Sequence, residues 1–359
     1  MPRSSGTPWV SALPSLASDV VPDLVTVGGL TVDNVIAADG RVGLAKAGGN
    51  GAYSAVGALM WQERIGLVST SVATYPRETI DRLERGGVDL GGVAWTDDQL
   101  TACSWFIYDD AGHRDEGLAS PPEALAEAGF PTDHLTPAQV AEWRQVLLAR
   151  EAPEEINYSE FRIRHPLTPA QIPDGWHAAR GVLLAPSQPS VMIAMLDHFG
   201  PGGATIIADP GWQLAAHKLD EIAPILGRLD AFLPSEVELR ALVPGTGLND
   251  ALRVLARACP GELAVKLGPE GVLVWNRETE TSTKVSAVPA RTVDPTGAGD
   301  SFCGGFLAGF VETGDPVKAA HFGAISASRI VAHFGADGAL PIDRNSLRQS
   351  LQREVLPCP

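Results

Sequence analysis

The residues with the clearest chemical potential lie in one short stretch, 294–302, which reads DPTGAGDSF. A proline ends regular structure before it, and from residue 298 onward the apolar residues recur at helical spacing, so the stretch predicts a turn that opens a helix. The first N–H groups of a helix have no partner inside the helix, and its dipole favours negative charge there. Gly297, Ala298 and Gly299 therefore form a candidate anion cradle. Asp300 lies directly beside it and could take a proton from a hydroxyl that attacks a bound phosphoryl group.

The alternative interpretation of this stretch is that its two aspartates only cap an ordinary helix. The complete string is more specific, because it resembles the C-terminal signature of the ribokinase-like (PfkB) carbohydrate kinases, D-[TP]-x-G-A-G-D. The resemblance implies an ATP-dependent kinase that transfers the γ-phosphoryl group to a hydroxyl of a small sugar or sugar derivative. It also implies ATP and Mg²⁺ as cofactors, Asp300 as the catalytic base and residues 297–299 as the anion hole.

Composition limits the classes of partner. The chain has 359 residues, of which 45 % are apolar and 19 % charged, as in globular proteins. Its formal net charge is −16 and no basic residues cluster, so we expect neither nucleic acid nor a membrane as partner. The four cysteines are widely spaced and form no C-x-x-C, which fits a reducing cytosol and predicts a cytoplasmic location. Residues 1–22 contain no long apolar run and are predicted to be a loose N-terminal arm.

Alternation of strand and helix patterns predicts an α/β fold, a doubly wound, largely parallel sheet of the ribokinase-like, Rossmann-like type with a small β-sheet lid. Strands are expected at 23–30, 65–72, 182–185, 204–209, 231–233, 262–267 and 272–275, and a strand end at 288–293. Helices are expected at 77–86, 190–199, 219–226, 235–242, 250–258, 300–311, 316–332 and 345–351. The kinase domain should span 23–340, and a C-terminal helix and tail 341–359.

The substrate end of the sheet is predicted from two motifs. Asp33 follows the first strand, at the place where open α/β sheets bind ligands, although a turn-forming Asp is equally compatible with the pattern. In the family that the chain resembles, the matching Asp binds substrate hydroxyls. Gly48, Gly49 and Asn50 begin the string GGNGA, which is similar to the family's G-G-x-x-A signature that packs against the sugar. These four residues are the candidates for substrate binding.

The nucleotide end is predicted from motifs that only partly match the family. Ser235 and Glu238 lie where the family carries N-x-x-E, which organises Mg²⁺ and phosphate largely through water, and here Ser replaces Asn. A helix-capping box is the alternative interpretation of this pair. Lys266, Gly268 and Gly271 resemble the nucleotide loop [TK]-x-G-x-x-G, for which a glycine-rich β-hairpin is the alternative.

Two weaker correspondences concern the adenine base and a monovalent cation. Residues 322–335 fall where relatives form the adenine pocket. Asp294 and Thr296, with Gly335, match positions where some relatives hold K⁺, so K⁺ is a candidate cofactor.

The lid is predicted from residues 34–47, which contain a hairpin signal at Asp39-Gly40, and from 101–115. The turn at 109–114 resembles the family's D-x-x-G-x-R, and the family uses such a lid over the sugar and sometimes for dimerisation, so a homodimer through the lid is a candidate. Residues 116–176 form an atypical Pro-rich, acidic insertion with a helix at 136–149. This insertion is either a surface elaboration, a cover for the substrate or an oligomer interface.

Two other functions remain open from the sequence. One is a nucleoside kinase of the same family, of adenosine or pseudouridine type, in which Trp105 or Phe106 on the lid would stack on a base. The other is a non-catalytic sugar-binding sensor on the same scaffold, which would have no need of Asp300 or the cradle. The sequence leaves open which sugar or nucleoside is the acceptor and which hydroxyl receives the phosphoryl group.

Overall fold

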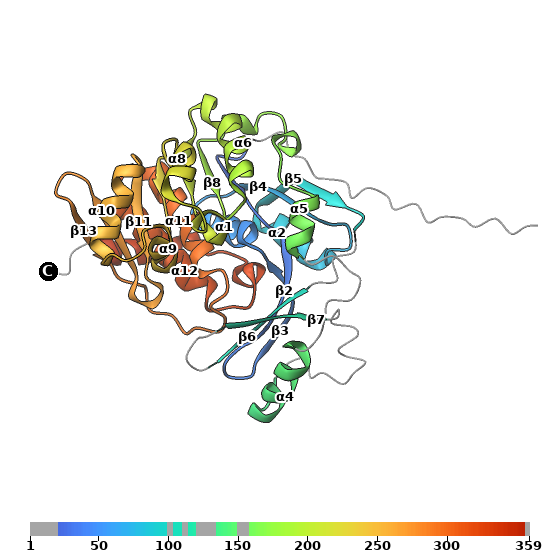
Figure 1. Cartoon of the computed structure of the whole chain (residues 1–359). Helices are drawn as coiled ribbons and strands as arrows, with labels where there is room; N and C mark the ends of the chain where they lie inside the picture. The colour runs from blue at the N-terminus through green and yellow to red at the C-terminus, as the bar shows by residue number, and fades with distance from the viewer. Residues whose placement is uncertain (1–20, 99–102, 110–113, 120–133, 149–157, 356–359) are drawn as a thin grey trace, which may run out of the picture.

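The structure is a computed structural model that describes residues 21–98, 103–109, 114–119, 134–148 and 158–355. Its body is a nine-stranded sheet in the order β13-β12-β11-β10-β9-β8-β1-β4-β5, covered by helices on both faces (Figure 1). Neighbouring strands are parallel from β10–β11 through β4–β5, whereas the β11–β12 and β12–β13 pairs are antiparallel. The predicted doubly wound, largely parallel sheet is therefore confirmed.

The strands of the main sheet are β1 (Leu24–Val27), β4 (Ile65–Val72), β5 (Val88–Thr96), β8 (Gly181–Leu184), β9 (Thr205–Ala208), β10 (Ala231–Phe232), β11 (Glu262–Lys266), β12 (Val272–Asn276) and β13 (Thr281–Val285). The helices around it are α1 (Asn50–Leu59), α2 (Arg77–Gly86), α6 (Pro189–Phe199), α7 (Gly211–Ala215), α8 (Leu219–Leu226), α9 (Glu236–Leu242), α10 (Leu248–Ala258), α11 (Ala298–Thr313), α12 (Pro316–Ile330) and α13 (Arg344–Val355). Short 3₁₀ turns are η1 (Pro169–Gln171), η2 (Trp176–Ala178), η3 (Gly200–Gly202), η4 (Gly268–Glu270) and η5 (Ala336–Ala339).

Alternate residues of the central strands pack into two apolar layers. Leu24 of β1 and Leu183 of β8 belong to the layer that contains α1, α11 and α12. Val25 and Val182, their neighbours in sequence, belong to the layer that contains α6, α8 and α10. Burial on both faces explains why these strands read as nearly continuous apolar runs. Among the described residues, no helix is long and apolar enough to cross a membrane.

The lid is a second sheet in the order β3-β2-β6-β7, which stands off one end of the body (Figure 1). Its strands are β2 (Thr31–Ile36), β3 (Val42–Gly48), β6 (Cys103–Tyr108) and β7 (Arg114–Ala119), so the lid extends past the expected limits at residues 34 and 115. β2 and β3 form the predicted hairpin, and all six residues of β6 pair with β7. The expected turn at 109–114 lies mostly outside the described residues.

The predicted helix of the insertion is confirmed as α4 (Pro137–Leu148). The Thr136 hydroxyl accepts a hydrogen bond from the Gln139 N–H at 3.4 Å, and the Gln139 side chain accepts one from the Thr136 N–H at 2.9 Å. α4 packs on the lid, because its Leu147 shares an apolar cluster with Ile36, Trp105 and Ile107. A second helix of the insertion, α5 (Tyr158–Arg164), lies on the body instead (Figure 1).

One sequence prediction of a strand was wrong, and two strands were missed. The expected strand end at 288–293 is irregular and mostly exposed, because the N–H groups of Val293 and Asp294 both donate to the Val331 carbonyl rather than to a sheet neighbour. β5 was not predicted, since Gly91 and Gly92 interrupt its apolar pattern. β13 was not predicted either, because it is largely exposed and has no apolar alternation.

Candidate active site

The predicted turn before α11 forms as expected. Gly297 precedes the helix with φ +73°, a left-handed conformation that favours glycine, and a Cβ there would overlap the ring of Tyr53. α11 packs on α1 backbone to backbone, since a Cβ on Gly304 would overlap the Ser54 carbonyl and a Cβ on Gly57 would overlap that of Ser301. This close packing fixes the N-terminus of α11 relative to the sheet.

Two of the backbone donors at this N-terminus are unused within the described part of the chain. The N–H of Ala298 donates to Pro295 at 3.3 Å and that of Ser301 donates to Gly297 at 2.9 Å. No acceptor from the described part of the chain takes the N–H groups of Gly299 or Asp300. Free donors at the start of a 16-residue helix have the geometry that the anion cradle requires.

Asp300 lies in the first turn of α11, half-buried at the cradle. Loss of hydration is the main cause that raises the pKa of Asp300 to about 7, and the negative charge of Asp209 adds to it, while Lys266 lowers it. A carboxylate with a pKa near 7 is matched to proton transfer at neutral pH. The electrostatics therefore suit the predicted role of Asp300 as a base.

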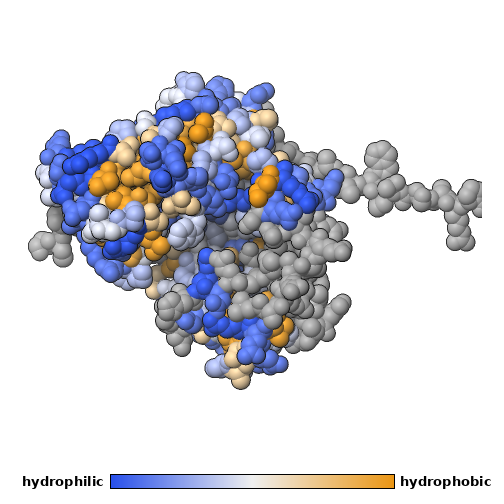
Figure 2. All heavy atoms as spheres, in the orientation of Figure 1, coloured by the Kyte–Doolittle hydropathy of each residue, from blue (hydrophilic) through white to orange (hydrophobic). Residues whose placement is uncertain are grey.

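Asp33 is buried on β2, with its carboxylate accepting a hydrogen bond from the Thr31 hydroxyl at 3.0 Å. A Cβ on Gly48 would overlap this carboxylate, so the glycine of the GGNGA string makes room for Asp33. Burial raises the pKa of Asp33 to about 7, and among the further causes are the charges of Asp294 and Asp300. The charge of Asp300 acts on Asp33, so two carboxylates from opposite ends of the chain lie near one another. The surface is hollowed between the body and the lid (Figure 2).

A hydrogen bond joins the lid to the signature stretch. Tyr108, the last residue of β6, lies 2.7 Å from Thr296, hydroxyl to hydroxyl. Asp294 is buried, accepts from the Thr296 N–H at 2.9 Å, and its Oδ2 has no hydrogen-bond partner among the described residues. Burial, the largest cause, raises the pKa of Asp294 to about 6. Asp294 and Thr296, the two candidates for K⁺ binding, are therefore hydrogen-bonded neighbours.

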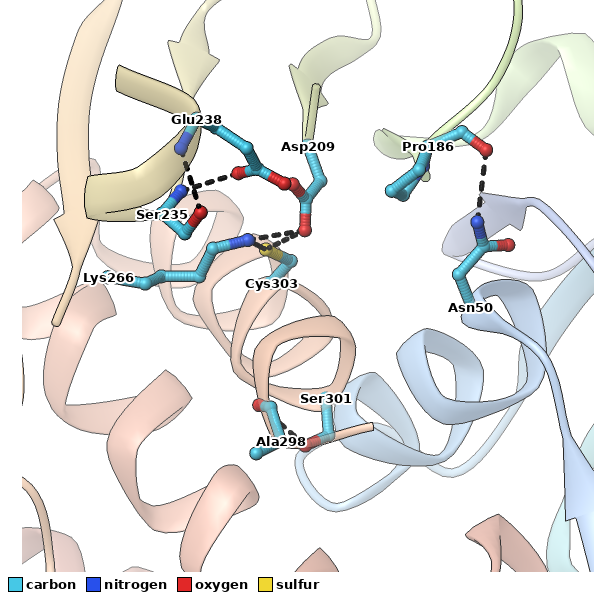
Figure 3. A network of polar contacts seen from close by, with 9 residues as sticks. All are labelled: Asn50, Pro186, Asp209, Ser235, Glu238, Lys266, Ala298, Ser301 and Cys303. Carbon is cyan, nitrogen blue, oxygen red and sulfur yellow. Dashed lines mark hydrogen bonds and ion pairs between the residues drawn. The ribbon is translucent and has the colours of Figure 1, made fainter. Parts of the chain in front are cut away.

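Asn50, the first residue of α1, supports the wall of the substrate end. Its Oδ1 accepts a hydrogen bond from the Gly29 N–H at 2.6 Å, and its Nδ2 donates to the Pro186 carbonyl at 3.0 Å (Figure 3). A Cβ on Gly49, at φ +89°, would press on the Gly29 backbone. Because both ends of the Asn50 amide have protein partners, the predicted contact of Asn50 with substrate would be made by its remaining N–H.

On the nucleotide side, Ser235 and Glu238 form the capping box of α9. The Ser235 N–H donates to the Glu238 carboxylate at 2.6 Å, and the Glu238 N–H donates to the Ser235 hydroxyl at 3.3 Å. Burial raises the pKa of Glu238, and the neighbouring Asp209 adds to this shift. The capping interpretation of the pair thus applies, and Glu238 also lies among the charged groups of the site (Figure 3).

Lys266 ends β11 and forms an ion pair with Asp209, which follows β9. Its ammonium group lies 3.5 Å from the Cys303 sulfur and 3.7 Å from where a Cβ on Gly299 would stand. Burial alone would lower the pKa of Lys266, but the charge of Asp209 raises it overall, so the side chain is a permanent cation. Lys266 therefore places a positive charge beside the cradle, where it would attract a bound anion (Figure 3).

The other members of the nucleotide motif, Gly268 and Gly271, turn the chain between β11 and β12. Both have positive φ, +59° and +99°, and nothing lies within 4 Å of a Cβ on Gly268. β11 and β12 are antiparallel, so this segment forms the glycine-rich hairpin that was the alternative interpretation of the motif. The hairpin leaves the Gly268 backbone open to a ligand.

The two lid aromatics face opposite ways. Trp105 is fully buried in the cluster between the lid and α4, so the expectation that it could stack on a base is wrong. Phe106 alternates with it along β6 and shares its strand face with Tyr108. The Arg114 guanidinium lies over the Phe106 ring, 4.7 Å from its centroid.

Sequence reasoning missed Asp209, Tyr53 and Tyr158. Asp209 had a usable signal, because it follows a strand at the carboxyl edge of a parallel sheet and precedes Pro-Gly. Tyr53 follows the GGNGA string, and its buried hydroxyl has no hydrogen-bond partner among the described residues. Tyr158 lies in the insertion, where no motif pointed to it.

The raised pKa values of the buried carboxylates predict an unusual pH dependence of stability. Asp300 binds its proton more tightly in the folded chain than in the unfolded one, so the free energy of unfolding should fall as pH rises from about 4 through about 7. Asp300→Asn has no carboxyl group at this position, so this fall in the free energy of unfolding should be absent from the variant. Its melting temperature should therefore rise relative to wild type as pH increases from 4 to 8.

The control for this comparison is Asp39→Asn, which removes an exposed carboxylate whose pKa is lowered mainly by Arg41. The melting temperature of Asp39→Asn should not rise relative to that of wild type as pH increases. A difference between Asp300→Asn and wild type that stays constant from pH 4 to pH 8 would show that the Asp300 pKa is ordinary.

A model of the pfkB family of carbohydrate kinases matches residues 176–343. The cytidine kinase of Thermococcus kodakarensis is 24 % identical over 289 residues, which cover 80 % of this chain and 88 % of that protein. The ATP-dependent ribose-1-phosphate kinase of Halopiger xanaduensis is 27 % identical over 316 residues, 84 % of this chain and 88 % of that protein.

A solved structure of Arabidopsis thaliana ribokinase, complexed with ribose and ATP, shares the fold. The TM-score is 0.63 at 22 % identity, over 93 % of this chain and 99 % of that chain. The matching family model, the relatives that span most of the chain and the common fold agree with the site geometry. The chain is therefore similar to the pfkB family of carbohydrate kinases over residues 176–343, and its relatives support an ATP-dependent kinase of a sugar or a nucleoside.

Proposed function

We propose that this chain transfers the γ-phosphoryl group of ATP to a hydroxyl of a compound that contains ribose, either a ribonucleoside or free ribose. The observation that carries the proposal is the meeting of Asp33 and Asp300. Asp33 comes from a lid strand and Asp300 from the N-terminus of α11, yet the charge of Asp300 is close enough to contribute to the raised pKa of Asp33. An acceptor held by Asp33 would present a hydroxyl to the base and to the cradle.

Each group has a defined task in this proposal. Asp33 accepts hydrogen bonds from acceptor hydroxyls, with Gly48, Gly49 and Asn50 forming the adjoining wall. Asp300 takes the proton of the attacking hydroxyl. The N–H groups at residues 297–299 stabilise negative charge on the transferred group.

The nucleotide would lie along the β11–β12 hairpin, with Lys266 supplying positive charge near its phosphates. Bound Mg²⁺ would neutralise the charge of the phosphates. The carboxylates of Glu238 and Asp209 offer oxygen ligands of the kind that Mg²⁺ prefers. Asp294 and Thr296 remain the candidates for K⁺.

The choice of a ribosyl acceptor rests on two observations. The relatives that span most of the chain are named for cytidine and for ribose 1-phosphate, both of which contain a ribose unit. Phe106 and Tyr108 share one face of β6, so the lid carries aromatic side chains beside the Asp33 strand. An aromatic lid face favours a nucleoside, because every base has a face on which a ring can stack.

Glu238 provides a test of the nucleotide end. Glu238→Gln should raise the Mg²⁺ concentration needed for half-maximal rate, because a carboxylate near a hard cation is lost while an amide oxygen can still accept the Ser235 N–H. Ser235→Asn should keep activity, because an amide oxygen can replace the hydroxyl as cap. The measurement is a Mg²⁺ titration of rate with a melting curve for each variant.

The matched control is Glu236→Gln, two residues before Glu238 on α9. The Glu236 carboxylate is paired with Arg240 at the surface. This variant should not move the Mg²⁺ dependence. If Glu238→Gln also leaves the Mg²⁺ dependence unchanged and only lowers the melting temperature, capping is the sole role of the pair.

The proposed function is tested by ADP release in the presence of Mg²⁺ and a panel of ribonucleosides, pentoses and hexoses. We expect at least one ribosyl compound to stimulate ADP release well above the rate without acceptor. Stimulation by hexoses with none from any ribosyl compound would contradict the assigned acceptor class. Absence of stimulation by every acceptor would contradict the kinase proposal for these residues.

A further inference from the structure

Helix α5 of the insertion is attached to the wall of the substrate end. Its Phe161 is buried, and the Arg162 guanidinium donates a hydrogen bond to the Pro186 carbonyl at 3.0 Å. The same carbonyl accepts from the Asn50 amide at 3.0 Å. The insertion and the start of α1 are thus joined through one acceptor, which places α5 at the acceptor end of the site.

Tyr158, the first residue of α5, lies directly over the turn that leads into the Asp33 strand. A Cβ added to Gly29 would overlap the Tyr158 hydroxyl oxygen and would lie 3.2 Å from the ring carbon Cζ that carries it. The Gly29 N–H is the group that Asn50 holds. The phenol therefore reaches the same turn that Asn50 holds.

The Tyr158 hydroxyl is neutral and has no protein partner within the described residues. Burial is the main cause that raises the pKa of Tyr158, Arg162 lowers it, and the charge of Asp33 adds to the rise. The Tyr158 hydroxyl makes no hydrogen bond with any residue that the structure describes, although the side chain is largely enclosed. The Tyr158 hydroxyl, an unused hydrogen-bond donor, thus lies near the carboxylate of Asp33, which can only accept hydrogen bonds once it is ionised.

A ligand hydroxyl fits this pair of groups, because it can donate one hydrogen bond and accept another at the same time. It would donate to Asp33 and accept from Tyr158. We propose that Tyr158 determines acceptor specificity, with its hydroxyl bonded to the acceptor hydroxyl that Asp33 binds and its ring forming one wall of the acceptor site. This inference rests on the proposed function and gives the insertion a role in selecting the acceptor.

The first test compares wild type with Tyr158→Phe, which removes the hydroxyl and keeps the ring. With the best ribosyl acceptor of the panel, the KM for acceptor should rise about three- to tenfold, while the KM for ATP stays unchanged. Analogues of that acceptor, each lacking one hydroxyl, provide the specific readout. One analogue should be disfavoured by wild type and disfavoured several-fold less by Tyr158→Phe. The control is Ile163→Ala on the same helix, where the side chain is 75 % exposed and should affect neither KM.

The second test needs no turnover. Gly29→Ala should lower the melting temperature in wild type, because its Cβ meets the Tyr158 hydroxyl, and should cost clearly less in a Tyr158→Phe background, where the nearest atom is the ring carbon at 3.2 Å. Equal losses in both backgrounds would show that the hydroxyl is not above Gly29 and would overturn the inference.

Two failures remain distinguishable. Turnover by wild type with unchanged KM and unchanged analogue preference in Tyr158→Phe would overturn the inference and leave the proposed function intact. No acceptor-dependent turnover by wild type with any acceptor would overturn the proposed function, and the inference with it.

Discussion

Asp300→Asn is expected to lower kcat by roughly 10²–10⁴-fold while ATP affinity stays near that of wild type. The substitution keeps the size of the side chain and the start of α11 but removes the carboxylate that is proposed to accept the acceptor's proton. ATP contacts would be made by the β11–β12 hairpin and Lys266, which the substitution leaves in place. The measurements are kcat with the best acceptor and ATP binding by calorimetry.

The matched control for this variant is Asp315→Asn. Asp315 caps the next helix, α12, through the N–H groups of Val317 and Lys318. The amide oxygen of Asn can still accept from both N–H groups, so stability should change by less than about 1 kcal/mol and kcat should stay unchanged. An Asp300→Asn variant that keeps more than about a third of the wild-type kcat would contradict the role of Asp300 as base.

Asp33→Ala should raise the KM for acceptor by about 10- to 100-fold and leave the KM for ATP nearly unchanged. Charge-assisted hydrogen bonds contribute roughly 1.5–3 kcal/mol each, and 1.4 kcal/mol is a factor of ten in affinity. The carboxylate lies on the lid strand β2, whereas the nucleotide hairpin is part of the opposite half of the main sheet.

The control is Asp39→Ala, at the exposed tip of the same lid hairpin, where the carboxylate is paired with Arg41 at 2.7 Å. It should change neither KM. If Asp33→Ala weakened ATP as much as it weakened the acceptor, the assignment of separate substrate and nucleotide ends would be wrong.

The features that the sequence predicted well are local in the chain. The turn at Gly297 and the start of α11 depend on a few adjacent residues, so the string DPTGAGDSF carries them. The same holds for the capping boxes at Thr136 and Ser235, where the two partners are three residues apart. The doubly wound sheet follows from the regular alternation of strand and helix patterns.

The features that the sequence did not predict depend on contacts between distant residues. Asp209 follows β9 and pairs with Lys266 at the end of β11, with β10 between the two strands, and neither residue's own surroundings in sequence reveal the pairing. Whether Trp105 or Phe106 faces the site depends on α4, which buries one side of the lid. Tyr158 acquires its position only because Arg162 and Phe161 attach α5 to the body.

The insertion contributes to two different parts of the molecule. β7 and α4 enlarge the lid, and the apolar contacts of α4 with Ile36 and Ile107 are structural. α5 instead contacts the acceptor end of the body. A dimer through the lid remains a prediction, and it would have to form with α4 already covering one face of the lid sheet.

The most direct measurement of the central claim is ³¹P NMR of the γ-phosphate of ATP during incubation with Mg²⁺, the best acceptor and either wild type or Asp300→Asn. For wild type, we expect the γ-phosphate signal to be replaced by that of a phosphate ester of the acceptor, with an equal amount of ADP. For Asp300→Asn, the ester should form at least about 100-fold more slowly. Wild type that binds the acceptor in a thermal-shift assay but yields no ester would contradict phosphoryl transfer and would support the non-catalytic sensor instead.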